Sequence, residues 1–184
     1  MANYGVTNST QFTAQTTCLS TYQALFSVAA STANTGAGGL VTGLRRGKLY
    51  DLLVGTNGAP ADNYIEWVVH RITDTAQTLA GNISSVSSQF ALDLADNGFA
   101  AHAGVNGSSN PSSTVYGFLS AGGIPWYVGV NQRASYRWVA APGSEIVWPA
   151  VSSGTGGNGL ALSFRSASGG YTGPGTCTVM FQEQ

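Results

Sequence analysis

Charged side chains are scarce in this 184-residue chain. Asp, Glu, Lys and Arg make up 8% of it, whereas roughly 25% is typical of soluble domains. Lysine occurs once, at Lys48, and the formal net charge is -1. Lysine keeps free sheet edges from pairing with neighbours, and a net charge of magnitude ~2–8 helps to keep a small domain monomeric. We therefore expect partner subunits to cover much of the surface; a secreted, Ser/Thr-rich monomer is the alternative.

The same scarcity argues against two classes of partner. Nucleic-acid binding needs clustered Lys and Arg, but the seven basic residues are spread along the chain, and Arg45, Arg46 and Lys48 form the only local group. No run approaches the ~20 apolar residues of a membrane helix. Residues 1–5 show no basic stretch followed by an apolar one, so no secretory signal is visible. We expect cytoplasmic synthesis and neither nucleic acid nor membrane as a partner.

Cysteine is also rare, with Cys18 near one end of the chain and Cys177 near the other. The two match no metal-ligand spacing. Buried thiols are the default for a protein made in a reducing cytosol. A disulfide between Cys18 and Cys177 is the alternative, because jelly-roll sandwiches place their first and last strands side by side.

Helical periodicity is nearly absent. Its best candidate, residues 89–96, is short and predicts one helical turn or a loop. Short β-prone runs separated by Gly, Asn, Pro and Ser fill the rest. Strands are expected within 22–30, 40–54, 64–73, 114–120, 126–130, 134–140, 144–151, 160–166 and 176–182. This pattern predicts an all-β, single-domain β-sandwich, with jelly-roll topology favoured.

Neither an internal repeat nor a change of composition divides the chain, which indicates one sandwich domain over residues 21–184. Residues 1–20 are polar, rich in Thr and Gln, and without strong periodicity. We expect an extended N-terminal arm there that reaches a neighbouring subunit. Residues 64–73 alternate and are apolar on both faces, which predicts a central strand or one covered by a partner.

Two sequence motifs bear on cofactor binding and catalysis. Residues 154–159 match G-x-G-x-x-G, but a dinucleotide site needs a helix after that loop, and a β-prone run follows. A mobile loop between strands is expected instead. A Gly-x-Ser-x-Gly nucleophile elbow does not occur; His70 falls within a strand and His102 within an Ala-rich loop.

Carboxylates give no stronger signal. Glu66, Asp93 and Glu145 are candidates for the pair that glycoside hydrolysis needs, but the sequence cannot bring two of them together. Asp93 and Asp96 offer oxygens to calcium without EF-hand spacing. We therefore predict no catalytic residue, no cofactor and no metal site.

The few charges are expected to pair, because an unpaired buried charge is costly. Glu145 follows a turn and lies near Arg133 and Arg137 in the sequence, so a hairpin would bring these opposite charges together. The three residues are candidates for structural ion pairs.

Aromatic residues have two interpretations. The candidates are Trp67, Trp126, Trp138, Trp148, Tyr50, Tyr64, Tyr116, Tyr127 and Tyr136. Large rings in strands are mostly core or interface anchors, and a sugar-stacking platform is the alternative.

Residues 46–51, 58–63 and 131–145, with Trp67 and Arg71, resemble small virion structural proteins of bacteriophages. The resemblance covers residues ~20–183. It implies a non-enzymatic β-sandwich subunit in symmetric oligomers, such as trimers or pentamers, on a virion made in the host cytoplasm. Other virion proteins, such as a major capsid protein, are the implied partners. Capsid subunit, capsid decoration protein, minor capsid protein and tail role stay open, and the alternative from another class is a carbohydrate-binding module or adhesin.

Overall fold

The computed structural model describes residues 2–8, 22–29, 46–73, 89–92, 102–105, 117–118, 123–150, 152–153, 156–166 and 170–184. These residues form thirteen β-strands and contain no helix. The strands are β1 (Ala2–Asn8), β2 (Gln23–Ala29), β3 (Gly47–Thr56), β4 (Tyr64–Thr73), β5 (Gln89–Ala91), β6 (His102–Val105), β7 (Gly117–Phe118), β8 (Trp126–Asn131), β9 (Tyr136–Val139), β10 (Ile146–Trp148), β11 (Ser152–Ser153), β12 (Gly156–Ser166) and β13 (Gly175–Glu183).

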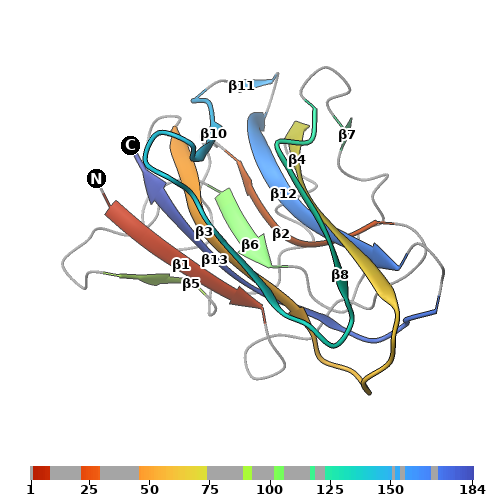
Figure 1. Ribbon diagram of the computed structural model, residues 1–184. Coiled ribbons are helices and arrows are strands. Elements are labelled where there is room, and N and C mark those ends of the chain that lie inside the picture. The colour runs from red at the N-terminus through yellow and green to blue at the C-terminus, as the bar shows by residue number, and fades with distance from the viewer. Residues whose placement is uncertain are drawn as a thin grey trace.

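The strands form two antiparallel sheets that pack face to face (Figure 1). In the first sheet the order is β10-β3-β13-β1-β5, and β9 also pairs with β3. In the second sheet the order is β6-β2-β12-β4-β7, while β8 also pairs with β4 and β11 with β12. The expected all-β sandwich is confirmed at this level.

Strand pairing proceeds inward from the two ends of the chain. β1 pairs with β13, and β2 pairs with β12. β3 then pairs with β9 and β10, and β4 with β7 and β8. Successive pairs alternate between the first and the second sheet. These nested pairs thus alternate between the two sheets, while β5 and β6 pair with β1 and β2.

β9 and β10 follow the same side of β3, with a turn between them. Ser144 N donates to Ala141 O at 2.8 Å, and Gly143 has a φ of 85°. Proline followed by a residue at positive φ is typical of a type II turn, where glycine is favoured. The Pro142-Gly143 turn thus allows β9 and β10 to pair with successive parts of β3.

The core lies between the sheets because strand residues alternate between inside and outside. In β13, every second residue from Gly175 to Glu183 is buried. The largest fully buried side chains are Trp67, Trp148, Phe26, Phe164, Phe181, Leu25, Leu49, Leu52, Ile65 and Leu160. Phe26 of the second sheet meets Phe181 of the first with ring centroids 6.1 Å apart, so aromatic contacts join the two layers.

The expectation of an arm over residues 1–20 is wrong for Ala2–Asn8. These residues form β1, which pairs with β13 from Ala2↔Glu183 to Asn8↔Cys177. Tyr4 is buried and stacks on Phe181 at 5.8 Å. The strand pattern of β1 is hard to recognise in the sequence, because polar Asn3 and Thr7 lie on its outer face while Tyr4 on the inner face is buried. Residues 9–21 lie outside the described part of the chain.

Two local expectations also need correction. Gln89–Ala91 form β5 beside β1 and not a helical turn; residues 93–96 lie outside the described residues. Gly156–Gly159 of the glycine-rich run belong to β12 and not to a mobile loop, while residues 154–155 are not described. In both cases, pairing with neighbouring strands outweighs weak local propensity.

Candidate interaction surface

Four ion pairs join eight of the charged residues in the described part of the chain. They are Lys48–Glu145 at 3.0 Å, Arg133–Asp62 at 2.9 Å, Arg137–Asp51 at 2.6 Å, and Arg165–Glu66. Arg133, Arg137 and Glu145 thus each have an ionic partner, but the hairpin contact expected among these three does not form. Both β9 and the turn before β10 lie beside β3, so Lys48 and Asp51 of β3 become the partners of Glu145 and Arg137.

The pair between Asp51 and Arg137 is bidentate. Arg137 Nε donates to Asp51 Oδ1 at 3.0 Å, and the terminal nitrogen donates to Oδ2 at 2.6 Å. Two parallel charge-assisted hydrogen bonds fix the orientation of both groups. Asp51 is buried whereas Arg137 is exposed, so the arginine neutralises a carboxylate that would otherwise be costly to bury.

β8 and β9 are the edge strands of the two sheets on one side of the sandwich. Within the described residues, β8 pairs only with β4 and β9 only with β3. In Figure 1, β8 follows the border of the second sheet. Between residues 124 and 140, Arg133 and Arg137 are the only charged residues, and both already have an acidic partner. Neither edge strand carries a lysine, the residue that commonly prevents an edge strand from pairing with another chain.

Exposed apolar side chains gather on the same side. Among the described side chains, seven large hydrophobic ones are exposed: Leu53, Tyr64, Leu92, Ile124, Tyr127, Tyr136 and Val139. All except Leu92 lie on β8 or β9, within two residues of β8, or on β3 and β4 next to these strands. We call Leu53, Ile124, Tyr136 and Val139 the edge surface. Val128, Val130 and Trp138 of the core reach partway to solvent beside it.

Three aromatic rings join the two sheets at this edge. Trp126 at the start of β8 lies 6.1 Å from Tyr136 and 6.4 Å from Trp138 of β9, as measured between ring centroids. Tilted pairs at this separation are favourable ring contacts. The edge therefore has a defined shape even though its strands belong to different sheets.

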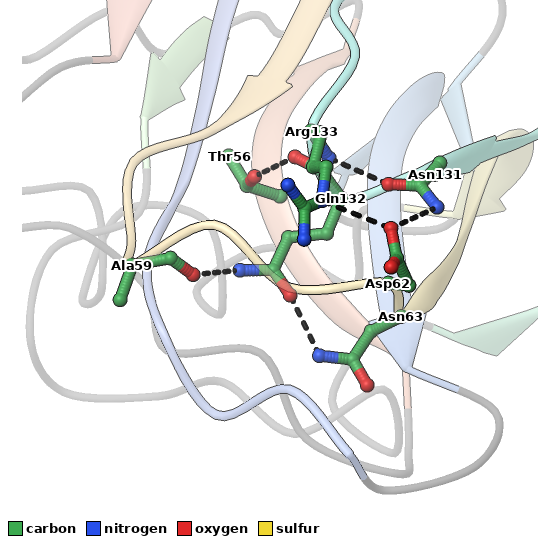
Figure 2. Close-up of polar contacts among 7 residues, drawn as sticks. All are labelled: Thr56, Ala59, Asp62, Asn63, Asn131, Gln132 and Arg133. Atoms are coloured by element: carbon green, nitrogen blue, oxygen red, sulfur yellow. Dashed lines mark hydrogen bonds and ion pairs between the residues drawn. The ribbon is translucent and has the colours of Figure 1, made fainter.

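Two crossover loops fix the end of the edge (Figure 2). Gln132, only 5% exposed, follows β8, and Asn63 precedes β4. Asn63 Nδ2 donates to Gln132 Oε1 at 2.6 Å, and Gln132 Nε2 donates to Ala59 O at 2.5 Å. Thr56 Oγ1 donates to Gln132 O at 2.7 Å. Both ends of the Gln132 side-chain amide thus tie the loop between β8 and β9 to the loop between β3 and β4.

Asn131, Asp62 and Arg133 are exposed and form a second set of polar contacts near Gln132 (Figure 2). Asn131 Oδ1 accepts from Arg133 N at 2.9 Å, and Asn131 Nδ2 donates to Asp62 Oδ1 at 3.4 Å. The sequence links residues 58–63 with residues 131–145 only through the resemblance. It offered no sign that Gln132 joins them, because a single glutamine in a loop has no pattern.

The residues weighed for catalysis do not form a reactive cluster among the described side chains. His70 and Ser163 are both buried, and His70 Nε2 lies 2.8 Å from Ser163 Oγ. Burial lowers the pKa of His70 to about 4, so its imidazole is neutral at pH 7. Glu66 pairs with Arg165 and Glu145 with Lys48, while Asp93 and Asp96 lie outside the described residues.

The described part of the chain has no cluster of three or more His, Cys, Asp or Glu able to hold a metal ion. It also has no helix of the length and hydropathy needed to span a bilayer. Cys177 is buried in β13, and Cys18 is not described, so their disulfide stays a prediction. His102 lies in β6 and not in the expected loop.

The tryptophans and tyrosines divide between core and surface. Trp67 and Trp148 are fully buried, whereas Tyr64, Tyr127 and Tyr136 are exposed; Tyr116 is outside the described residues. Alternation alone could not separate these roles, because it places residues on a face without showing what covers that face.

No protein-family model matches the chain, and comparison with curated proteins and with solved structures gives no significant match.

Proposed function

We propose that this chain is a non-enzymatic structural subunit of a bacteriophage virion, which assembles into symmetric oligomers as a capsid, minor capsid or capsid decoration protein. We assign the chain to a virion because residues 46–51, 58–63 and 131–145 resemble such proteins. The observation that carries the assembly is the edge surface: exposed apolar side chains lie on or next to the edge strands β8 and β9, whose two arginines are paired with acidic residues of the same chain.

We infer, in addition, that the sandwich has jelly-roll topology. The support is the nested pairing of β1 with β13, β2 with β12, β3 with β9 and β10, and β4 with β8. An antiparallel hairpin rolled around a core gives this alternation between sheets, and virus capsid domains use double-sheet jelly rolls.

A second copy of the chain is the occupant that we assign to the edge surface. Unpaired edge strands offer backbone donors and acceptors to another strand. Because the charged residues around the edge surface are paired within the chain, an edge of a second copy can approach it without ionic repulsion. Exposed apolar side chains beside such edges favour contact with another protein surface.

The opposite edges of the two sheets are β5 and β6. A contact of the β8 and β9 edge with the β5 and β6 edge of the next copy would be heterologous. Heterologous contacts close into rings when the rotation per subunit permits, and this supports the trimer or pentamer implied by the resemblance.

Val139→Lys tests the assembly. Val139 is 57% exposed on β9, so the fold has room for lysine, whereas a charge there opposes edge pairing and burial of the edge surface. We expect the purified protein to form one closed oligomer, and the variant to need at least about tenfold more protein to assemble. Size-exclusion chromatography with light scattering over a dilution series measures this.

Thr172→Lys is the matched control, because it adds the same charge at an exposed position in the loop before β13. It should assemble like the unmodified chain. A protein that remains monomeric at all concentrations, or a Val139→Lys variant that assembles normally, would contradict the role of the edge surface. Mass spectrometry of purified phage particles tests the virion separately and should find the chain at a fixed ratio to the major capsid protein.

A further inference from the structure

A row of polar and aromatic side chains crosses the outer face of the second sheet. Arg165 of β12 pairs in register with Glu66 of β4, and Glu66 pairs with Gly129 of β8. Tyr22 precedes β2 beside Arg165, whose guanidinium carbon lies 4.5 Å from the centre of the Tyr22 ring. Tyr64 and Tyr127 flank Gly129. We call Tyr22, Tyr64, Glu66, Tyr127 and Arg165 the tyrosine strip.

Hydrogen bonds connect the whole tyrosine strip. Glu66 Oε2 accepts from Tyr22 Oη at 3.1 Å and from Arg165 Nε. Glu66 Oε1 accepts from Tyr127 Oη at 3.3 Å, and the hydroxyls of Tyr127 and Tyr64 lie 2.8 Å apart. The contact with Arg165 holds the pKa of Glu66 below its usual range, so the carboxylate is ionised and the strip carries no net charge.

Gly129 determines where the Tyr64 ring lies. A Cβ atom on residue 129 would come within 1.9 Å of Tyr64 Oη and 2.3 Å of Tyr64 Cζ. The phenol end of Tyr64 therefore occupies the space directly above the backbone of β8, and any side chain at residue 129 would displace it. This absence of a side chain lets Tyr64 reach Tyr127.

The rings are exposed although their hydroxyls are fixed. Tyr64 is 47% and Tyr127 51% exposed, so about half of each side chain contributes no buried area to the fold. Ordering exposed side chains costs rotamer entropy, and a fold gains little from this without a ligand. Rings that are fixed before a ligand arrives lower the entropic cost of binding it.

We propose that the tyrosine strip is a binding site for a neutral saccharide. The exposed tyrosine rings offer apolar surface to the C–H face of a sugar ring. Tyr127, Glu66 and Arg165 offer hydroxyl, carboxylate and guanidinium groups to sugar hydroxyls. From Tyr22 to Gly129 the strip crosses three strand spacings, roughly 14 Å at ~4.8 Å each, which suits a linear oligosaccharide.

The charges of the tyrosine strip favour a neutral ligand over an anionic one. Arg165 is the only cation of the strip, and its Nε is already bound to Glu66. A phosphate or a sialic acid carboxylate would have to compete with that carboxylate and would lie close to its negative charge. Sugar hydroxyls, which both donate and accept hydrogen bonds, meet no such repulsion. This inference does not depend on the virion assignment.

Saturation-transfer NMR and a glycan array on the full chain test the site. The probes are neutral oligosaccharides of glucose, galactose and mannose, with sialyllactose as the anionic comparison. We expect saturable binding of at least one neutral class and none of sialyllactose. Tyr64→Ala should weaken binding about tenfold, the loss expected for one stacking contact.

Gly129→Ala gives an independent test, because it keeps every residue of the tyrosine strip and only displaces the Tyr64 ring. It should weaken saccharide binding to a similar extent. Tyr136→Ala is the matched control: Tyr136 is 37% exposed but belongs to the edge surface, so its loss should impair assembly and leave saccharide binding unchanged. Near-ultraviolet circular dichroism confirms that each variant is folded.

Three results would overturn the inference. One is that neither method detects any neutral saccharide. Another is binding that Tyr64→Ala and Gly129→Ala leave unchanged. The third is loss of assembly, without loss of a saccharide, in the Tyr64→Ala and Gly129→Ala variants, which would assign the strip to a protein contact. Failure of the edge surface in the Val139→Lys experiment would leave this site unaffected.

Discussion

Gln132 shows how much one polar side chain can organise in a protein with few charges. Its side-chain oxygen accepts from Asn63, its side-chain nitrogen donates to Ala59 O, and its backbone N donates to Asn63 O at 2.8 Å. All these groups lie where two loops cross between the sheets. Buried polar groups are costly unless they are hydrogen-bonded, so this geometry is strongly preferred over any alternative loop path.

Gln132→Leu should therefore be destabilising. Leucine fills a similar volume but leaves Asn63 Nδ2 and Ala59 O without their partners, which costs about 2 kcal/mol in the free energy of unfolding. Urea unfolding followed by tryptophan fluorescence measures this. Arg133→Ala, at the next residue in the chain, is the control. It removes an exposed ion pair with Asp62 that is worth less than about 1 kcal/mol. Equal losses in the two variants would show that the buried amide has no special role.

At the scale of elements, strands with a strong apolar pattern could be located from the sequence. The expected range 64–73 coincides with β4 (Tyr64–Thr73), and 126–130 with all but one residue of β8 (Trp126–Asn131). In both strands, large side chains face the core at every second position. The central position expected for β4 is confirmed, because it has β12 on one side and β7 and β8 on the other.

The strands that the sequence did not reveal are β1, β5, β6 and β11. Three of them are short. β5 and β6 form their hydrogen bonds with β1 and β2, which lie far away in the sequence, whereas the two-residue β11 pairs with the adjacent β12 and is too short to show a pattern. β1 is long but has small and polar residues, and pairing with β13 at the other end of the chain determines it. Pairings between distant segments cannot be recognised from the local sequence. The same limit applies to the edge surface and the tyrosine strip, whose residues come from separate strands.

β1 gives the element-scale prediction. Deletion of residues 1–8 would remove the strand between β13 and β5 and the Tyr4 ring that stacks on Phe181. We expect a loss of more than about 3 kcal/mol in the free energy of unfolding, measured by urea titration. Thr7→Ala, which removes only the outer-face contact of Thr7 Oγ1 with Thr178 Oγ1 at 3.3 Å, should change it by less than about 1 kcal/mol. A truncated chain of unchanged stability but weaker assembly would restore the hypothesis of an arm.

The whole molecule has so few ionisable groups that single residues control its response to pH. The chain has eight acidic residues and two histidines. Hydrogen bonding within the chain lowers the pKa of Glu66 through Arg165, and that of Glu145 through backbone amides and then Lys48. Both shifts start from an ordinary value of 4.5, so the stability that they contribute is lost only at or below about pH 4.5. Between pH 4.5 and neutrality, His70 is therefore the described residue whose protonation is expected to change the free energy of unfolding.

Acidification should reveal that effect. Burial lowers the pKa of His70 from 6.5 to about 4, so the unfolded chain binds a proton in this range and the folded chain does not. Stability is then complete above pH 6.5 and falls progressively until about pH 4, by roughly 3 kcal/mol in total. Urea unfolding at half-unit steps of pH measures the slope. His70→Gln, whose amide nitrogen can still reach Ser163, should remove most of the slope, whatever its stability at pH 7; an unchanged slope would place the titrating group elsewhere.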